Sequence, residues 1–189
     1  EINKSSDPLV KLGRSLYFEK ALSGNGQMSC NTCHNLKTYG VDNEATSKGI
    51  KGKRGDRNSP TVYNASLHIA QFWDGRAKDV EEQALGPILN PIEMALPSEA
   101  EAIKRLSSKK KYVSMFKAAF PKSKKPIIYN NIGVAIGAFE RTLLTPSRFD
   151  QFLNGEINAL NKQEKRGLKT FIEIGCVSCH DGPAVGGGQ

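Results

Sequence analysis

Apolar residues recur every three to four positions along most of the chain, which is the spacing of amphipathic helices. The first such stripe follows Asp7-Pro8, a pair typical of a helix N-cap and first turn. Further helices are predicted over 60–67, 80–85, 98–106, 112–120 and 130–144, and a last helix begins after Asn161. Because no stretch alternates between apolar and polar positions as a half-buried strand does, the sequence predicts an all-α fold.

Two segments interrupt this pattern. Residues 39–59 contain four glycines, several Lys and Arg and few apolar residues, so they predict one long loop. A loop of this length in a compact domain is usually functional or mobile. Thr145-Pro146-Ser147 predicts a linker. The chain is therefore expected to form a first unit over 1–144 and a second unit over 145–189.

Composition and charge limit the classes of protein to which the chain can belong. With 189 residues, 38% of them hydrophobic and 24% charged, the chain can bury a core without disulfide bonds. No apolar run reaches the roughly 18–20 residues that span a bilayer, so no membrane span is predicted. A formal net charge of +8 suggests nucleic-acid binding. The lysine clusters at 109–111 and 122–125 lack interleaved aromatic residues and any known binding motif, so no nucleic-acid partner is expected.

Cysteine and histidine are the most informative residues. All four cysteines and two of the three histidines lie in two copies of a C-x-x-C-H motif, Cys30 to His34 and Cys176 to His180. This is the attachment signature of c-type haem. Cys30 and Cys33, like Cys176 and Cys179, would form thioethers to one porphyrin, and the adjacent His34 or His180 would bind its iron. The sequence predicts two covalently bound haems.

Other uses of these cysteines fit less well. A disulfide framework would leave the two histidines unexplained, and the two C-x-x-C pairs lie too far apart for a usual zinc knuckle. A thioredoxin-like motif would need βαβ surroundings that the pattern lacks. Thioether attachment takes place outside the cytoplasm, and the N-terminal residues are polar. We therefore expect a periplasmic protein whose signal peptide has been removed.

The chain resembles the bacterial di-haem cytochrome c peroxidases, a family that includes the MauG-like enzymes. The segments that carry the resemblance are LGRSLYF (12–18), SCNTCH (29–34), RNSPT (57–61), QFWDGRA (71–77), EQALGPI (82–88), NPIEM (90–94) and GCVSCH (175–180). The resemblance implies two cytochrome-c-like haem domains. Residues 1–144 would form the peroxidatic domain, with the N-terminal helix a candidate to pack on the other domain. Residues 145–189 would begin the electron-transfer domain, which is expected to be incomplete because few residues follow His180.

Family members reduce H2O2 to water with electrons from a small redox protein, either a monohaem cytochrome c or a blue-copper protein. By resemblance, electrons enter at the second haem and pass to the first, where peroxide binds. The chain would be an N-terminal portion of such an enzyme, and a homodimer stays an open alternative. The excess positive charge is interpreted as a docking surface for an acidic electron donor.

The resemblance also assigns residues to the peroxidatic site. Glu93 and Gln83 match the polar residues of the distal pocket, Trp73 matches a tryptophan between the haems, and Asn58 matches a ligand of a calcium ion. A carboxyl group in an apolar haem pocket, such as that of Glu93, has a raised pKa and can move a proton between peroxide oxygens. The Gln83 amide can donate to and accept from peroxide. Arg76 could pair with a haem propionate, or with Asp74 or Asp79.

One departure from the family concerns the long loop. Many members carry there a histidine that occupies the sixth position of the resting peroxidatic haem, but Ile50 stands where that histidine would fall. Isoleucine cannot bind iron, so this haem is predicted to be five-coordinate or water-bound without reductive activation. His68 is the one alternative ligand, although a lone histidine is more often a packing residue. Met28, Met94 and Met115 are expected to pack in the core, with Met94 lining the pocket.

Two other functions remain open on sequence alone. A MauG-like oxidase would use the same haems to modify tryptophans of a protein partner, and Ile50 is compatible with it. A non-catalytic electron-transfer cytochrome would have two six-coordinate haems and would leave Gln83 and Glu93 without a role.

Overall fold

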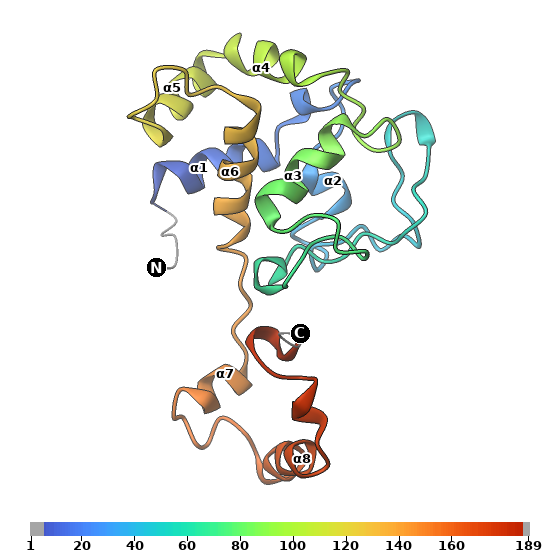
Figure 1. Ribbon diagram of the computed structural model, residues 1–189, viewed down its shortest axis with the longest axis vertical. Helices are drawn as coiled ribbons and strands as arrows, with labels where there is room; N and C mark the ends of the chain where they lie inside the picture. Colours follow the sequence, from blue (N-terminus) through green and yellow to red (C-terminus); the bar gives the residue numbers. More distant parts are fainter. Residues whose placement is uncertain (1–5, 187–189) are drawn as a thin grey trace. The chain divides into compact units, whose positions relative to one another are not determined.

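A computed structural model describes residues 6–186 (Figure 1). Residues 1–5, which include the largely polar N-terminus, and residues 187–189 lie outside the described residues. Within 6–186 the regular structure is helical, with no β-strand and only two isolated bridges, Lys48–Arg54 and Gln71–Ala77. The prediction of an all-α fold is confirmed. Over the same range, none of the helices has both the length and the apolar content needed to cross a membrane.

The chain divides into two compact units, which we describe separately. Unit 1 is Glu1–Ser66 with Ala70–Leu143, and unit 2 is Leu67–Ile69 with Leu144–Gln189. The elements up to the end of unit 1 are α1 (Pro8–Tyr17), η1 (Lys20–Leu22), α2 (Cys30–Cys33), η2 (Ile50–Gly52), η3 (Ala65–Leu67), α3 (Val80–Leu89), α4 (Glu99–Ser107), α5 (Lys110–Ala119) and α6 (Tyr129–Glu140). The remaining elements are α7 (Arg148–Leu153), α8 (Lys162–Glu173), η4 (Cys176–Ser178) and η5 (Pro183–Val185).

The helix predictions succeed where a cap accompanies the apolar pattern. Asp7 caps α1 by accepting from the Leu9 amide at 2.8 Å, and Asn161 forms a capping box with Glu164 at the start of α8. The helix expected over 60–67 is wrong: Asn64 has a φ of 60°, outside the right-handed helical region, so only η3 forms there.

Two further boundaries differ from the predicted ones. Helix α3 runs past the predicted end at residue 85 to Leu89, and α6 ends at Glu140 rather than at residue 144. At the end of α6 the carbonyl of Phe139 accepts from both the amide (2.9 Å) and the hydroxyl (2.7 Å) of Thr142, which close the last turn. Helix α7 was not predicted.

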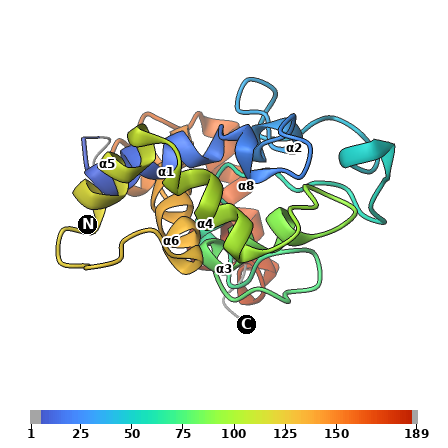
Figure 2. The ribbon, with the colours of Figure 1, turned by 90° about the horizontal axis from the view of Figure 1, so that it is seen from above.

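The core of unit 1 is built around the crossing of α1 and α6, which Figures 1 and 2 show from two directions. Leu12, Leu16 and Tyr17 of α1 are fully buried, and the Tyr17 ring meets Phe139 edge to face at 5.3 Å between centroids. A Cβ atom at Gly13 would lie 1.8 Å from the carbonyl oxygen of Ala135, so only glycine permits this approach. The N-terminal helix thus packs within unit 1, against α5 and α6.

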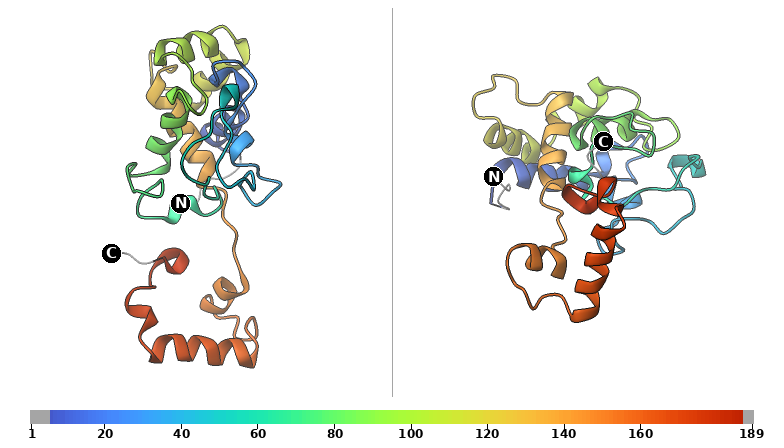
Figure 3. Two further views of the ribbon diagram at one scale, coloured as in Figure 1. Left: turned by 90° about the vertical axis from the view of Figure 1, so that its right-hand side faces the viewer. Right: turned by 60° about the horizontal axis from the view of Figure 1, so that its bottom comes forward.

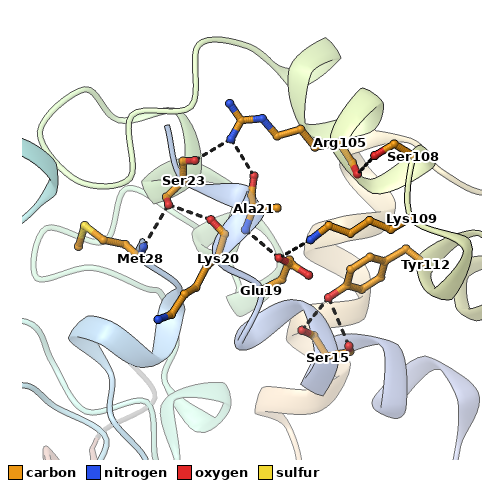
Figure 4. A network of polar contacts seen from close by, with 10 residues as sticks. All are labelled: Ser15, Glu19, Lys20, Ala21, Ser23, Met28, Arg105, Ser108, Lys109 and Tyr112. Atoms are coloured by element: carbon orange, nitrogen blue, oxygen red, sulfur yellow. Dashed lines mark hydrogen bonds and ion pairs between the residues drawn. The ribbon is translucent and has the colours of Figure 1, made fainter. Parts of the chain in front are cut away.

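A polar network ties α4 and α5 to the segment that leads into the first haem motif (Figure 4). Arg105 donates from one guanidinium nitrogen to the carbonyls of Ala21 (3.2 Å) and Ser23 (2.8 Å), while Glu101 binds its Nε at 2.7 Å. The Ser23 hydroxyl in turn accepts from the amide of Met28 at 3.1 Å. The backbone before α2 is therefore held by a charged side chain from α4.

Replacing Arg105 with Ala is expected to lower the free energy of unfolding by about 2 kcal/mol, because it leaves two carbonyls of unit 1 without their charged donor. The matched control is Lys104→Ala on the adjacent, largely exposed position, for which a change within about 0.5 kcal/mol is expected. Denaturant unfolding of the haem-loaded protein measures both variants. Equal effects of the two substitutions would contradict a role of the Arg105 network in stability.

Unit 2 buries little of its own surface. Among its described residues only Leu160 is buried, and α8 exposes Ile172 by 52%. Its second haem motif follows α8, as the two views of Figure 3 show. The described part of unit 2 thus holds the second motif without an apolar core around it.

Candidate haem-binding site

The first C-x-x-C-H motif forms α2, a single helical turn. Ser29 precedes it, and its amide donates to the Thr32 hydroxyl at 3.0 Å, as in a capping box. The turn brings Cys30 and Cys33 into the wall of the same cavity, together with His34 immediately after it. Neither cysteine is in a disulfide bond.

The His34 imidazole is oriented for metal binding. Its Nδ1 lies 3.0 Å from the carbonyl oxygen of Pro60, which can only accept, so Nδ1 carries the proton and Nε2 is left to bind a metal. Desolvation lowers the pKa of His34, which favours the neutral form that a metal requires. The Tyr17 hydroxyl donates to the His34 carbonyl at 2.5 Å and anchors the motif to α1.

The two thiols are poor nucleophiles in this setting. Burial raises the pKa of Cys30 to about 12 and also raises the pKa of Cys33. A redox-active C-x-x-C has a lowered thiol pKa instead. The raised thiol pKa values therefore do not favour the thioredoxin-like alternative, and no group of three or more His, Cys, Asp or Glu among the described residues is arranged to hold a zinc ion.

A cavity of about 390 Å³ opens beside α2. Its wall contains apolar side chains together with a few polar groups, including Met28, Cys30, Cys33, His34, Val62, Phe72, Trp73, Arg76, Gln83, Ala84, Pro87, Glu93, Met94 and Glu140. This composition is typical of a cofactor site, in which apolar walls bury the ligand and polar groups orient it. Two thiols, a free imidazole nitrogen and apolar walls in one cavity fit a c-type haem. Met28 and Met94 line this cavity, whereas Met115 packs against the core.

Glu93 is half-buried in the cavity wall. Burial raises its pKa, while a hydrogen bond from Asn90 and the positive charge of Arg76 oppose the increase. A carboxyl group with a raised pKa exchanges a proton more readily near neutral pH. Gln83 reaches the same cavity from α3. Pro87, one turn further along α3, has no amide hydrogen to donate to the Gln83 carbonyl. The helix therefore lacks one backbone hydrogen bond where it forms the cavity wall.

The long loop is fastened to the segment that carries Glu93. The Ile50 amide donates to the carbonyl of Glu93 at 2.9 Å, and the Ile50 side chain is buried. A Cβ atom at Gly49 would lie only 1.8 Å from the Ile92 carbonyl oxygen. The loop therefore positions the Glu93 backbone, while Ile50 provides no group that could bind iron.

Trp73 lies at the cavity wall but not in the core. Its side chain is 64% exposed, and its indole N–H donates to the carbonyl of Asn58 at 2.8 Å. Among the described residues, Trp73 is therefore not part of the core of unit 1. The Asn58 side chain donates to the carbonyl of Glu44 at 2.7 Å, and its calcium assignment stays a prediction.

Arg76 already has partners within unit 1. Its guanidinium lies 3.4 Å above the centre of the Phe72 ring and pairs with Asp74 at 2.8 Å. Asp74 also binds Arg57 at 2.5 Å, and these hydrogen bonds lower the pKa of Asp74 to about 2. Of the partners predicted for Arg76, the structure thus shows Asp74, and a propionate would join an existing cluster of charges at the cavity.

The second motif lies in unit 2, where Cys176 is partly exposed and the rest of the motif is exposed. Cys176 lies in η4, the His180 Nδ1 is 3.3 Å from the Val185 carbonyl, and its ring is 6.2 Å from that of Phe171. Cys179 is exposed as well. His68, the alternative ligand, is exposed and does not line the cavity of unit 1.

Sequence reasoning missed Glu140. This carboxyl group ends a largely apolar helix, where a charged residue usually marks the return to solvent, but it is 5% exposed and lines the cavity. No feature of the sequence distinguishes it from an exposed helix end.

Comparison with known proteins finds similar sequences and structures. A family model of the di-haem cytochrome c peroxidases matches residues 7–158. The cytochrome c551 peroxidase of Pseudomonas aeruginosa is 50% identical over 184 residues, which are 96% of this chain and 53% of that protein. The cytochrome c551 peroxidase of Nitrosomonas europaea is 50% identical over 180 residues, 95% of this chain and 53% of that protein.

A solved structure of a MauG-like protein associated with microbial copper homeostasis is also similar, with a TM-score of 0.80 and 34% identity. The match covers 94% of this chain and 53% of that one. The chain thus spans about half the length of the curated relatives it matches.

Proposed function

Because the chain belongs to the di-haem cytochrome c peroxidase family, we propose that it provides the peroxide-reducing site of an enzyme that converts H2O2 to water. The observation that carries the proposal is the cavity of unit 1, where the haem attachment residues share a wall with Glu93 and Gln83. A non-catalytic electron carrier would have no use for a half-buried carboxyl group at this place.

A haem held by Cys30, Cys33 and His34 would supply a one-electron redox centre to which peroxide can bind. Glu93 would then accept the proton of the near peroxide oxygen and return it to the far oxygen, so that water can leave. Burial raises its pKa above that of an exposed glutamate, so the carboxyl group is easier to protonate than one on the surface. The Gln83 amide, which does not titrate, would orient the peroxide by donating and accepting hydrogen bonds.

Electrons would come from a small redox protein, either a monohaem cytochrome c or a blue-copper protein, through a second haem at Cys176, Cys179 and His180. Trp73 would conduct them to the first haem, since its indole is held by Asn58 and its ring is exposed. We place the protein in the periplasm, because covalent haem attachment takes place outside the cytoplasm. A calcium ion bound with the help of Asn58 belongs to the same proposal.

The test of the proposed function is the spectrum of the diferric, haem-loaded protein, followed by addition of H2O2 with a reduced donor. Because Ile50 cannot bind iron, we expect a high-spin first haem and turnover without a lag. Prior reduction with ascorbate, the control, should leave the initial rate unchanged. Two unreactive low-spin haems would contradict the peroxidase, and a bis-histidine signal from the first haem would contradict the open coordination.

A MauG-like oxidase is the second candidate, favoured by the similarity to a MauG-like structure and by Ile50. The same experiment separates the two functions by product. A peroxidase oxidises two equivalents of a one-electron donor for each H2O2. An oxidase instead consumes peroxide in the presence of a tryptophan-containing partner protein and leaves the small donor reduced.

A further inference from the structure

One buried carboxyl group of the cavity, that of Glu140, has no role in the proposed reduction of peroxide. Glu140 is the last residue of α6, 5% exposed, and lines the cavity that contains Cys30 and His34. Its side chain makes no hydrogen bond or ion pair with another described residue. The next residue, Arg141, pairs instead with Glu81 of α3, through Nε at 2.9 Å and Nη2 at 2.7 Å. The positive charge closest in sequence is therefore already neutralised.

The groups around Glu140 leave its negative charge uncompensated. Glu81 of α3 adds a like charge, which the paired Arg141 offsets only in part, and the facing groups of α1 and α2 are the Tyr17 hydroxyl and the Cys30 thiol. Burial raises the pKa of the Tyr17 hydroxyl, which therefore stays neutral, and the Cys30 sulfur is an uncharged thioether once the haem is attached. Transfer of an unpaired carboxylate into such a site costs free energy. Burial accordingly raises the pKa of Glu140 to about 8.

A charge change in the cavity would act strongly on this carboxyl group. A haem gains one unit of positive charge on oxidation, and the low dielectric of a protein interior strengthens its attraction to a nearby carboxylate. Glu140 lines the same cavity as Cys30, the residue to which the ring would be attached. An ionised Glu140 would therefore stabilise the oxidised haem and disfavour the reduced one.

We propose that Glu140 is the redox-linked proton site of the first haem. When an electron from the donor of the proposed function reaches this haem, the Glu140 carboxylate takes one proton from solvent and becomes a carboxylic acid. On reoxidation it releases that proton. The reduction of one H2O2 to two waters consumes two electrons and two protons, so Glu140 would bring a proton to the cavity together with an electron. The inference rests on the haem of the proposed function, but not on peroxide turnover.

The test is the midpoint potential of the first haem measured by spectroelectrochemistry between pH 6 and pH 10. The wild-type potential should fall as the pH rises from about 7 to 9, by up to about 59 mV for each tenfold fall in proton activity. Glu140→Gln should remove this slope, while Glu99→Gln, the same change at an exposed position of α4, should retain it. A slope kept in Glu140→Gln, or absent from the wild type, would overturn the proposal.

A second measurement needs no variant and covers the case in which Glu140→Gln fails to fold. Infrared difference spectra of the wild-type protein at pH 8 should show a protonated carboxyl band that appears on reduction of the first haem. Absence of that band would overturn the proposal. Both experiments are made without peroxide, so a protein that shows the slope and the band but does not turn over H2O2 would refute the proposed function and leave this inference standing.

Discussion

Replacement of Glu93 with Gln is expected to lower kcat for H2O2 by roughly 10²–10⁴-fold while both haems stay attached. The amide keeps the size and hydrogen-bonding capacity of the carboxyl group but cannot take a proton from one peroxide oxygen and give it to the other. Steady-state turnover with a reduced donor measures the effect, and the absorbance of the attached haem verifies the loading. Glu99→Gln, on the surface of the same unit, should retain wild-type kcat.

The pH profile makes this prediction specific. Glu93 must be ionised to accept the first proton, so wild-type activity should fall as the pH decreases through its pKa. Since burial raises that pKa, the acidic limb should lie above the ordinary range of glutamate. Glu93→Gln should lose this limb along with the activity. A variant that keeps kcat within threefold of the wild type, or that keeps the same acidic limb, would show that another group moves the proton.

The sequence was sufficient to predict the elements whose signals are local. Asp7 and Asn161 predicted the starts of α1 and α8 because a cap is a contact between residues two or three positions apart. Helix α7 escaped prediction because a helix of six residues offers fewer than two turns of apolar periodicity. The error over 60–67 has a backbone cause, since the left-handed conformation of Asn64 cannot be read from composition.

For the candidate site too, some residues could be predicted from the sequence and others could not. Its covalent residues follow from the spacing of C-x-x-C-H, and the resemblance to the family pointed to Glu93 and Gln83, which the structure brings to one cavity wall. The exposure of Trp73 and the burial of Glu140 depend on how distant segments pack, so neither pattern nor composition could predict them. The same holds for Gly49, where the need for glycine comes from a segment more than 40 residues further along the chain.

Gly49→Ala tests whether the long loop positions Glu93. The new Cβ atom would overlap the Ile92 carbonyl oxygen, which lies 1.8 Å away, so the loop and the Glu93 segment must separate. Separation would also break the hydrogen bond from the Ile50 amide to the Glu93 carbonyl. Because a displacement of about 1 Å at a reacting group can cost about 10²-fold in rate, we expect kcat to fall on the order of 100-fold, with a lowered Tm.

Gly167→Ala in α8 is the control, since it makes the same substitution where no other atom lies within 4 Å of the added Cβ and Gly167 does not line the cavity. It should keep wild-type kcat and should not lower Tm. A loss of activity in Gly49→Ala through global unfolding would also lower the haem-to-protein ratio or the far-UV helical signal, whereas displacement of Glu93 alone would leave both unchanged. If Gly49→Ala and Gly167→Ala behave alike, the contact between the loop and the Ile92–Glu93 backbone does not position the catalytic carboxyl group. The orientation of Glu93 would then have to come from its own turn, through the hydrogen bond with Asn90.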